Sequence, residues 1–165
     1  MKISRIKLIA AALTVGLSLS TVALAPAYAE ATQADIDYST QVSQLYQTFA
    51  SDTADWGAAL AGAPTLAFGS KWKAYKAKVT KSSDKFLVTI KKLKALTPGP
   101  GFTKSGPMLV TAMGFYESAV TALKTGATKN DVKAVAKAGK VAAQATTAFL
   151  AWSKVYPAEV AALNG

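Results

Sequence analysis

Apolar side chains recur every three or four positions along most of this chain, the spacing that places them on one face of an α-helix. Asp52 is the one polar member of the clearest series, which steps alternately by four and three residues: Tyr38, Val42, Leu45, Phe49, Asp52, Trp56 and Ala59. The sequence lacks alternating apolar and polar runs bounded by turn residues, the pattern of a β-strand. The pattern therefore predicts an all-α protein.

Glycine and proline clusters divide this pattern into four segments, and the strongest break is the run from Thr97 to Gly101. Gly126 is expected to end the third helix in the C′ position, and Pro157 is expected to end the fourth. The predicted helices cover about these residues: 35–61, 70–96, 105–125 and 129–156. Four amphipathic segments joined by short loops predict an antiparallel four-helix bundle.

The helix starts and the core follow from the same pattern. Ser105 is expected to cap the third helix, and Thr128 the fourth, where Asp131 completes a sequence close to a capping box. Alanines on the apolar faces of these two helices predict that they pack closely together. Large aromatic residues are expected to fill the rest of the core: Phe49, Trp56, Trp72, Tyr75, Phe86, Phe149 and Trp152.

Asp52 interrupts the apolar face of the first helix, and two explanations remain open. In the one that the sequence favours, Ser51 or Asp52 caps a second, shorter helix with Asp55 at its N3 position. In the other, the apolar face carries one buried carboxylate that has a partner. Asp52 and Asp55 are also one turn apart, but Ca²⁺ requires six or more oxygens and the neighbouring sequence does not supply that many. Capping and solvation are therefore favoured over acid–base chemistry.

The first 29 residues have the organisation of a secretory signal peptide. Three basic residues precede the short apolar run from Leu8 to Leu17, and Ala27-Tyr28-Ala29 forms a cleavage site. We expect cleavage after Ala29, which leaves residues 30–165 as one helical domain that is exported and is not transmembrane. Its location is then extracellular or in the cell envelope.

The exported domain is strongly basic. Of the 19 basic and nine acidic residues in the chain, the signal peptide holds Lys2, Arg5 and Lys7, which leaves 16 lysines, nine acids and a net charge of +7. The candidate binding residues for an anionic partner lie early in the second predicted helix: Lys71, Lys73, Lys76, Lys78, Lys81 and Lys85.

The arrangement of these lysines limits what they are expected to bind. On a helical wheel they surround the second helix instead of forming one stripe, and the fourth helix places its lysines at its outermost positions. A nucleic-acid surface would cluster them, and the domain has no arginine for bidentate phosphate contacts. We therefore predict a solvated basic surface with weak affinity for anionic cell-wall polymers or lipid headgroups, and no specific nucleic-acid binding.

The composition excludes much of catalytic chemistry. The chain has no histidine and no cysteine, which removes His-based triads, thiol catalysis, disulfides and most transition-metal sites. The segment from Gly101 to Gly106 departs from a phosphate-binding loop because Thr103, not glycine, precedes Lys104. No catalytic residue, metal site or cofactor is predicted, and the protein is not expected to be an enzyme.

The C-terminal two-thirds of the chain resembles a group of small, alanine-rich, signal-bearing helical proteins of high-GC Gram-positive bacteria. Trp72 and Tyr75, the segments Leu93–Pro98 and Ala119–Gly126, and the alanine-rich last helix carry this resemblance. Many members have a lipid-anchor cysteine after the signal, which this chain lacks. The resemblance implies a secreted or envelope-associated helical protein, and it implies no ligand or active residue.

Two functions are consistent with these observations. The first is an exported, non-catalytic protein that binds anionic envelope components through its lysine-rich surface. The alternative is a carrier that holds a small apolar ligand between the helices, where aromatic and methionine side chains would line the cavity.

Overall fold

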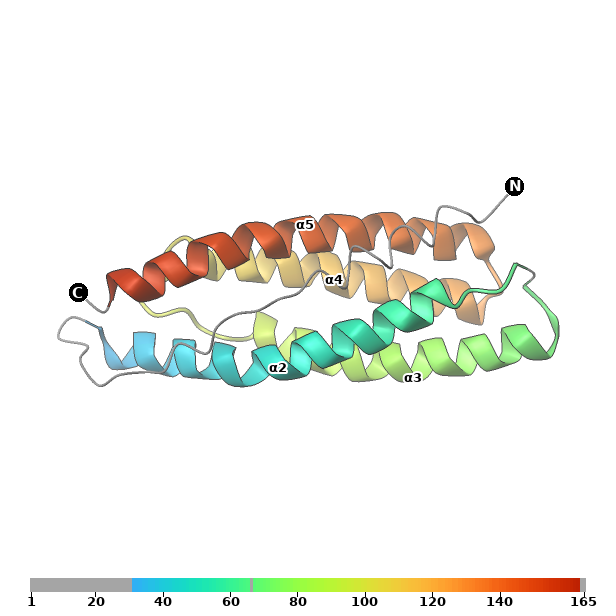
Figure 1. The fold of residues 1–165 in the computed structure, drawn as a ribbon, viewed down its shortest axis with the longest axis horizontal. Coiled ribbons are helices and arrows are strands. Elements are labelled where there is room, and N and C mark those ends of the chain that lie inside the picture. Colours follow the sequence, from blue (N-terminus) through green and yellow to red (C-terminus); the bar gives the residue numbers. More distant parts are fainter. Residues whose placement is uncertain (1–30, 66, 164–165) are drawn as a thin grey trace.

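The structure, a computed structural model, describes residues 31–65 and 67–163. The predicted signal peptide, residues 1–29, lies outside the described residues. The described part contains four helices and no strand: α2 (Gln33–Ala61), α3 (Gly69–Lys94), α4 (Ser105–Thr128) and α5 (Val132–Ala162). Successive helices run in opposite directions, with α2 and α3 in one layer and α4 and α5 in the other (Figure 1). The prediction of an all-α four-helix bundle is confirmed.

Aromatic rings fill the centre of the bundle. The ring of Phe49 in α2 lies 5.4 Å from that of Phe86 in α3 and 4.8 Å from that of Phe149 in α5, measured between centroids. Tyr116 of α4 completes this cluster at 5.3 Å from Phe49. All seven aromatic residues predicted for the core are buried. Of the helices that lie side by side around the bundle, α2 and α5 approach each other least, and the rings of Phe49 and Phe149 bridge the space between them.

The α4–α5 pair packs most closely, as its alanines predict. Gly126 contributes to this approach, because a Cβ there would lie 2.9 Å from the backbone nitrogen of Val135 and 3.0 Å from the Cβ of Ala134. The prediction that Gly126 occupies the C′ position is wrong, since α4 continues to Thr128. The glycine serves close helix packing and not helix termination.

Asn130 ends α4 instead. Its φ of 58° lies in the left-handed region that Asn tolerates better than most residues. The amide of Asp131 donates to the carbonyl of Gly126 at 2.8 Å, and the amide of Asn130 donates to that of Ala127 at 3.3 Å, which together form a Schellman motif. Asp131 then caps α5 by accepting a hydrogen bond from the amide of Ala134. The predicted capping box starting at Thr128 is therefore wrong by three residues.

Helix α5 continues through Pro157, which was expected to end it. Proline has no N–H, so one backbone hydrogen bond is lost at this point. Contacts beyond the proline hold the last turn: the carboxylate of Glu159 accepts hydrogen bonds from the amides of Lys104 and Ser105, at 3.0 and 2.9 Å. Ser105 is thus the first residue of α4 and not its N-cap, and a carboxylate from α5 caps the helix in its place.

Asp35 joins the start of α2 to the loop between α3 and α4. Its carboxylate forms a capping box with Thr32, and its Oδ1 also accepts a hydrogen bond from the amide of Gly101 at 2.7 Å. Gly99 is pressed against the same residue, since a Cβ there would lie 2.3 Å from Oδ1. This arrangement seats Phe102 in the core, 4.8 Å from the ring of Tyr38. The loop is therefore a packed part of the fold.

Candidate functional site

The predicted candidate lysines differ in their surroundings. Lys71, Lys73, Lys78 and Lys81 are exposed and Lys76 is half-buried. None of these five forms an ion pair with any residue that the structure describes. The first half of α3 therefore carries five positive charges in eleven residues without a neutralising carboxylate, whereas the sixth candidate, Lys85, is paired.

The lysines of α3 lie on both flanks of the helix. On one flank, Lys85 contacts carboxylates of α2. On the opposite flank, Lys94 reaches Glu117 of α4, with 2.8 Å between Nζ and Oε2. The predicted distribution around the helix agrees with these contacts, which place α3 lysines toward two different neighbours. The positive charge of α3 is consequently spread over both flanks of the helix and is not confined to one face.

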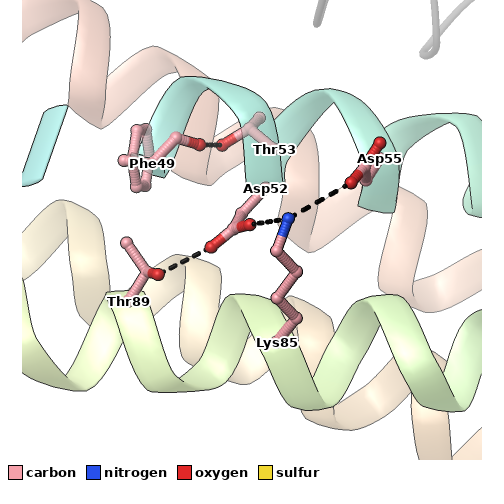
Figure 2. Close-up of polar contacts among 6 residues, drawn as sticks. All are labelled: Phe49, Asp52, Thr53, Asp55, Lys85 and Thr89. Carbon is pink, nitrogen blue, oxygen red and sulfur yellow. Dashed lines mark hydrogen bonds and ion pairs between the residues drawn. The ribbon is translucent and has the colours of Figure 1, made fainter. Parts of the chain in front are cut away.

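The environment of Asp52 differs from the one that the sequence favoured. Helix α2 runs without a break through this position, and Asp52 is 1 % exposed, so the favoured explanation of a second cap is wrong. Its Oδ2 accepts a hydrogen bond from the hydroxyl of Thr89 at 2.6 Å, and its Oδ1 lies 2.9 Å from the Nζ of Lys85 (Figure 2). The other explanation, one buried carboxylate with a partner, describes the structure.

Lys85 closes this polar site from outside. Its side chain is 56 % exposed and extends from α3 toward α2, so the ammonium reaches both water and carboxylates (Figure 2). Asp55, which is exposed, lies 3.5 Å from the same ammonium. The close contact with the Asp52 carboxylate and its negative charge raise the pKa of Lys85 above its usual value. The contact with Oδ1 is a charge contact without good hydrogen-bond angles, so Thr89 supplies the directional bond.

Asp35 and Glu159 are carboxylates held by backbone amides. Burial raises the pKa of Asp35, but hydrogen bonds from Thr32 and Gly101 outweigh it, and the net pKa lies below the usual value. Glu159 has the same balance, with burial opposed by hydrogen bonds from Ser105 and Lys104. Both groups are therefore charged at neutral pH and stabilise helix starts, which accounts for them structurally.

The buried tyrosines are poor acid–base groups. Burial and the nearby Tyr116 raise the pKa of Tyr46 to about 12, and burial raises that of Tyr75 to about 12. Both hydroxyls lack a hydrogen-bond partner within the described structure. Neither hydroxyl is deprotonated at neutral pH, so these residues contribute mainly apolar rings to the core.

Phe68 has a position that the sequence pattern did not identify. It lies in the loop between α2 and α3, outside every apolar series, and its side chain is 71 % exposed. The signal available in the sequence was a large apolar residue next to Gly69 in a predicted loop. It is the most exposed of the large apolar side chains that the structure describes.

Two further properties concern the described residues as a whole. They contain no cluster of three or more acidic side chains that could hold a metal ion. None of their helices combines the length and the apolar character needed to cross a bilayer.

Comparison with models of known protein families, with curated proteins and with solved structures finds no match for this chain.

Proposed function

We propose that this protein is an exported, non-catalytic bundle that binds anionic components of the cell envelope through its lysine-rich surface. The observation that carries the proposal is the first half of α3, where five lysines have no ion-pair partner among the described residues. Exposed charges of one sign attract a polyanion over several ångströms and do not require a shaped pocket. The location in the envelope or outside the cell rests on the predicted signal peptide.

The uses of the acidic residues support a binding role over a catalytic one. Asp35, Asp131 and Glu159 hold backbone amides, and Asp52 joins α2 to α3. Each of these carboxylates therefore already has a structural function. The remaining net positive charge is available to a partner.

The alternative, a carrier of an apolar ligand, has weaker support. The interior between the helices is occupied by rings that contact one another. Residues of α4 and α5, among them Met108 and Ala148, line a depression of about 310 Å³. This depression is open to solvent. Native mass spectrometry of the exported protein checks this alternative, since a co-purified lipid or sterol would favour a carrier.

Retention on anionic material at two salt concentrations tests the proposal. We expect retention on anionic vesicles or cell-wall preparations at about 50 mM salt and release at about 500 mM, because the range of exposed charges shortens from about 10 Å at 0.1 M to about 3 Å at 1 M salt. Replacing the five unpaired lysines in the first half of α3 with Gln is expected to weaken retention at low salt. Equal retention at both concentrations would contradict the proposal.

A further inference from the structure

One end of the bundle combines an exposed aromatic ring with unpaired lysines. Phe68 is 71 % exposed and directly precedes Gly69, whose φ of +80° is a conformation that glycine adopts without strain. This turn starts α3 immediately after Phe68, so the ring stands at the end of the helix and outside the core. The loop between α2 and α3 lies at the same end of the molecule as the turn between α4 and α5 (Figure 1).

A long-range hydrogen bond joins the two connections. The Nε1 of Trp72 donates to the Oδ1 of Asn130 at 2.6 Å, which fixes the first turn of α3 against the α4–α5 turn. Trp72 is buried and Asn130 is at the C′ position of α4. Charged residues close to these two positions in sequence are therefore held at one end of the bundle.

We call this end the basic tip, and it consists of these residues: Phe68, Lys71, Lys73, Lys129 and Lys133. The four lysines are exposed, and none forms an ion pair with a described residue. The acidic residue nearest to them in sequence is Asp131, whose carboxylate accepts the hydrogen bond that caps α5. The tip thus presents one apolar ring within a positively charged surface.

We propose that the basic tip docks on an anionic lipid bilayer, with Phe68 inserted at the headgroup level and the lysines against lipid phosphates. This inference rests on the proposed function and names its partner. A hydrated wall polymer offers charge but no apolar phase, so it gives an exposed phenylalanine nowhere to be buried. A bilayer offers both, because its anionic headgroups lie directly over the acyl chains.

Docking by the tip leaves the bundle closed. The apolar faces of the four helices are already covered by each other, whereas Phe68 is free of the core. Lysine stems can lie along the bilayer surface while their ammonium groups stay in water beside phosphates. The contact is small, so the binding is weak, reversible and sensitive to salt.

Flotation with vesicles of phosphatidylglycerol and phosphatidylcholine tests whether the ring of Phe68 contributes to binding. We expect Phe68→Ala to lower partitioning about tenfold, since a buried phenylalanine side chain is a large part of a small apolar contact. Phe115→Ala is the matched control, because Phe115 is 38 % exposed on the side of α4, and it is expected to leave partitioning unchanged. Vesicles of phosphatidylcholine alone are expected to bind neither the wild type nor the variants.

Two triple variants with equal net charge test the position of the lysines. Lys71→Gln, Lys73→Gln and Lys129→Gln remove charge from the basic tip, whereas Lys91→Gln, Lys92→Gln and Lys154→Gln remove it from residues toward the other end of α3 and α5. We expect the first set to release the protein from phosphatidylglycerol vesicles at lower salt than the second set. Equal release by both sets would contradict docking by the tip.

The outcomes separate this inference from the function on which it rests. If Phe68→Ala behaves as Phe115→Ala while retention stays sensitive to salt, insertion of the ring is wrong and electrostatic binding stands. If Phe68→Ala weakens retention on wall polymer as much as on vesicles, the lipid bilayer is the wrong partner. If salt changes retention on neither material, the proposed function itself fails.

Discussion

The carboxylate of Asp52, which is buried, lies 2.9 Å from the ammonium of Lys85, whose side chain is more than half exposed. The pair connects α2 to α3, and Thr89, one turn further along α3, donates a hydrogen bond to the other carboxylate oxygen. A charged group inside an aromatic core is tolerated because both of its oxygens have partners. This site therefore joins α2 to α3 by polar contacts beside the aromatic packing.

Removing either partner is expected to weaken the fold. Asp52→Ala leaves the hydroxyl of Thr89 buried without an acceptor, so we expect a loss of about 1–3 kcal/mol in the free energy of unfolding. Lys85→Met leaves the carboxylate buried without a cation and is expected to destabilise more than Lys81→Met, the exposed and unpaired control. Urea unfolding followed by circular dichroism measures both. If Lys85→Met costs as much in the Asp52→Ala background as in the wild type, the two residues are not coupled.

Two glycines of α4 are expected to respond oppositely to alanine. Gly126→Ala places a Cβ against the backbone of α5, and we expect a loss of about 1–3 kcal/mol from overpacking. Gly114→Ala meets nothing within 4 Å, and we expect a gain of about 0.5–1 kcal/mol because alanine favours the helix. Thermal unfolding of the two variants compares them. A harmless Gly126→Ala would show that α4 and α5 are not held at this distance.

Asn130 has two separable roles in the α4–α5 turn. Asn130→Gly keeps the left-handed backbone but leaves the Nε1 of Trp72 without its acceptor, and we expect a loss of about 1–2 kcal/mol. Asn130→Ala also strains the backbone at φ of 58° and is expected to lose more. In a Trp72→Phe background the cost of Asn130→Gly is expected to disappear. Persistence of the full cost there would assign the effect to the turn alone.

Acid is expected to loosen the contacts of Asp35 and Glu159. Their folded pKa values lie below the usual ones, so the unfolded chain binds more protons in mildly acidic solution. The stability that they contribute is present above the unfolded values, about 4 to 4.5, and is lost as the pH falls through the lower folded values. Urea midpoints from pH 7 to pH 2 measure this decline. We expect the destabilisation by Asp35→Asn to shrink as the pH falls below the unfolded value, and a constant difference across the range would contradict this assignment.

Local patterns in the sequence determined the class and the number of the helices. An apolar residue at every third or fourth position produces an amphipathic helix wherever it occurs, and Gly-Pro clusters interrupt it, because both effects act within a few residues. The same periodicity turns the α3 lysines away from the core. These features do not depend on which helix lies beside which.

Only the tertiary structure decided the two exceptions at Asp52 and Pro157, because both depend on residues far away in the sequence. Asp52 resembled a helix cap until α3 brought Thr89 and Lys85 beside it. Pro157 resembled a helix end, but Glu159 beyond it binds amides more than 50 residues earlier in the chain. Packing free energy from such distant partners outweighs the local preference of a single residue, and no local pattern records those partners.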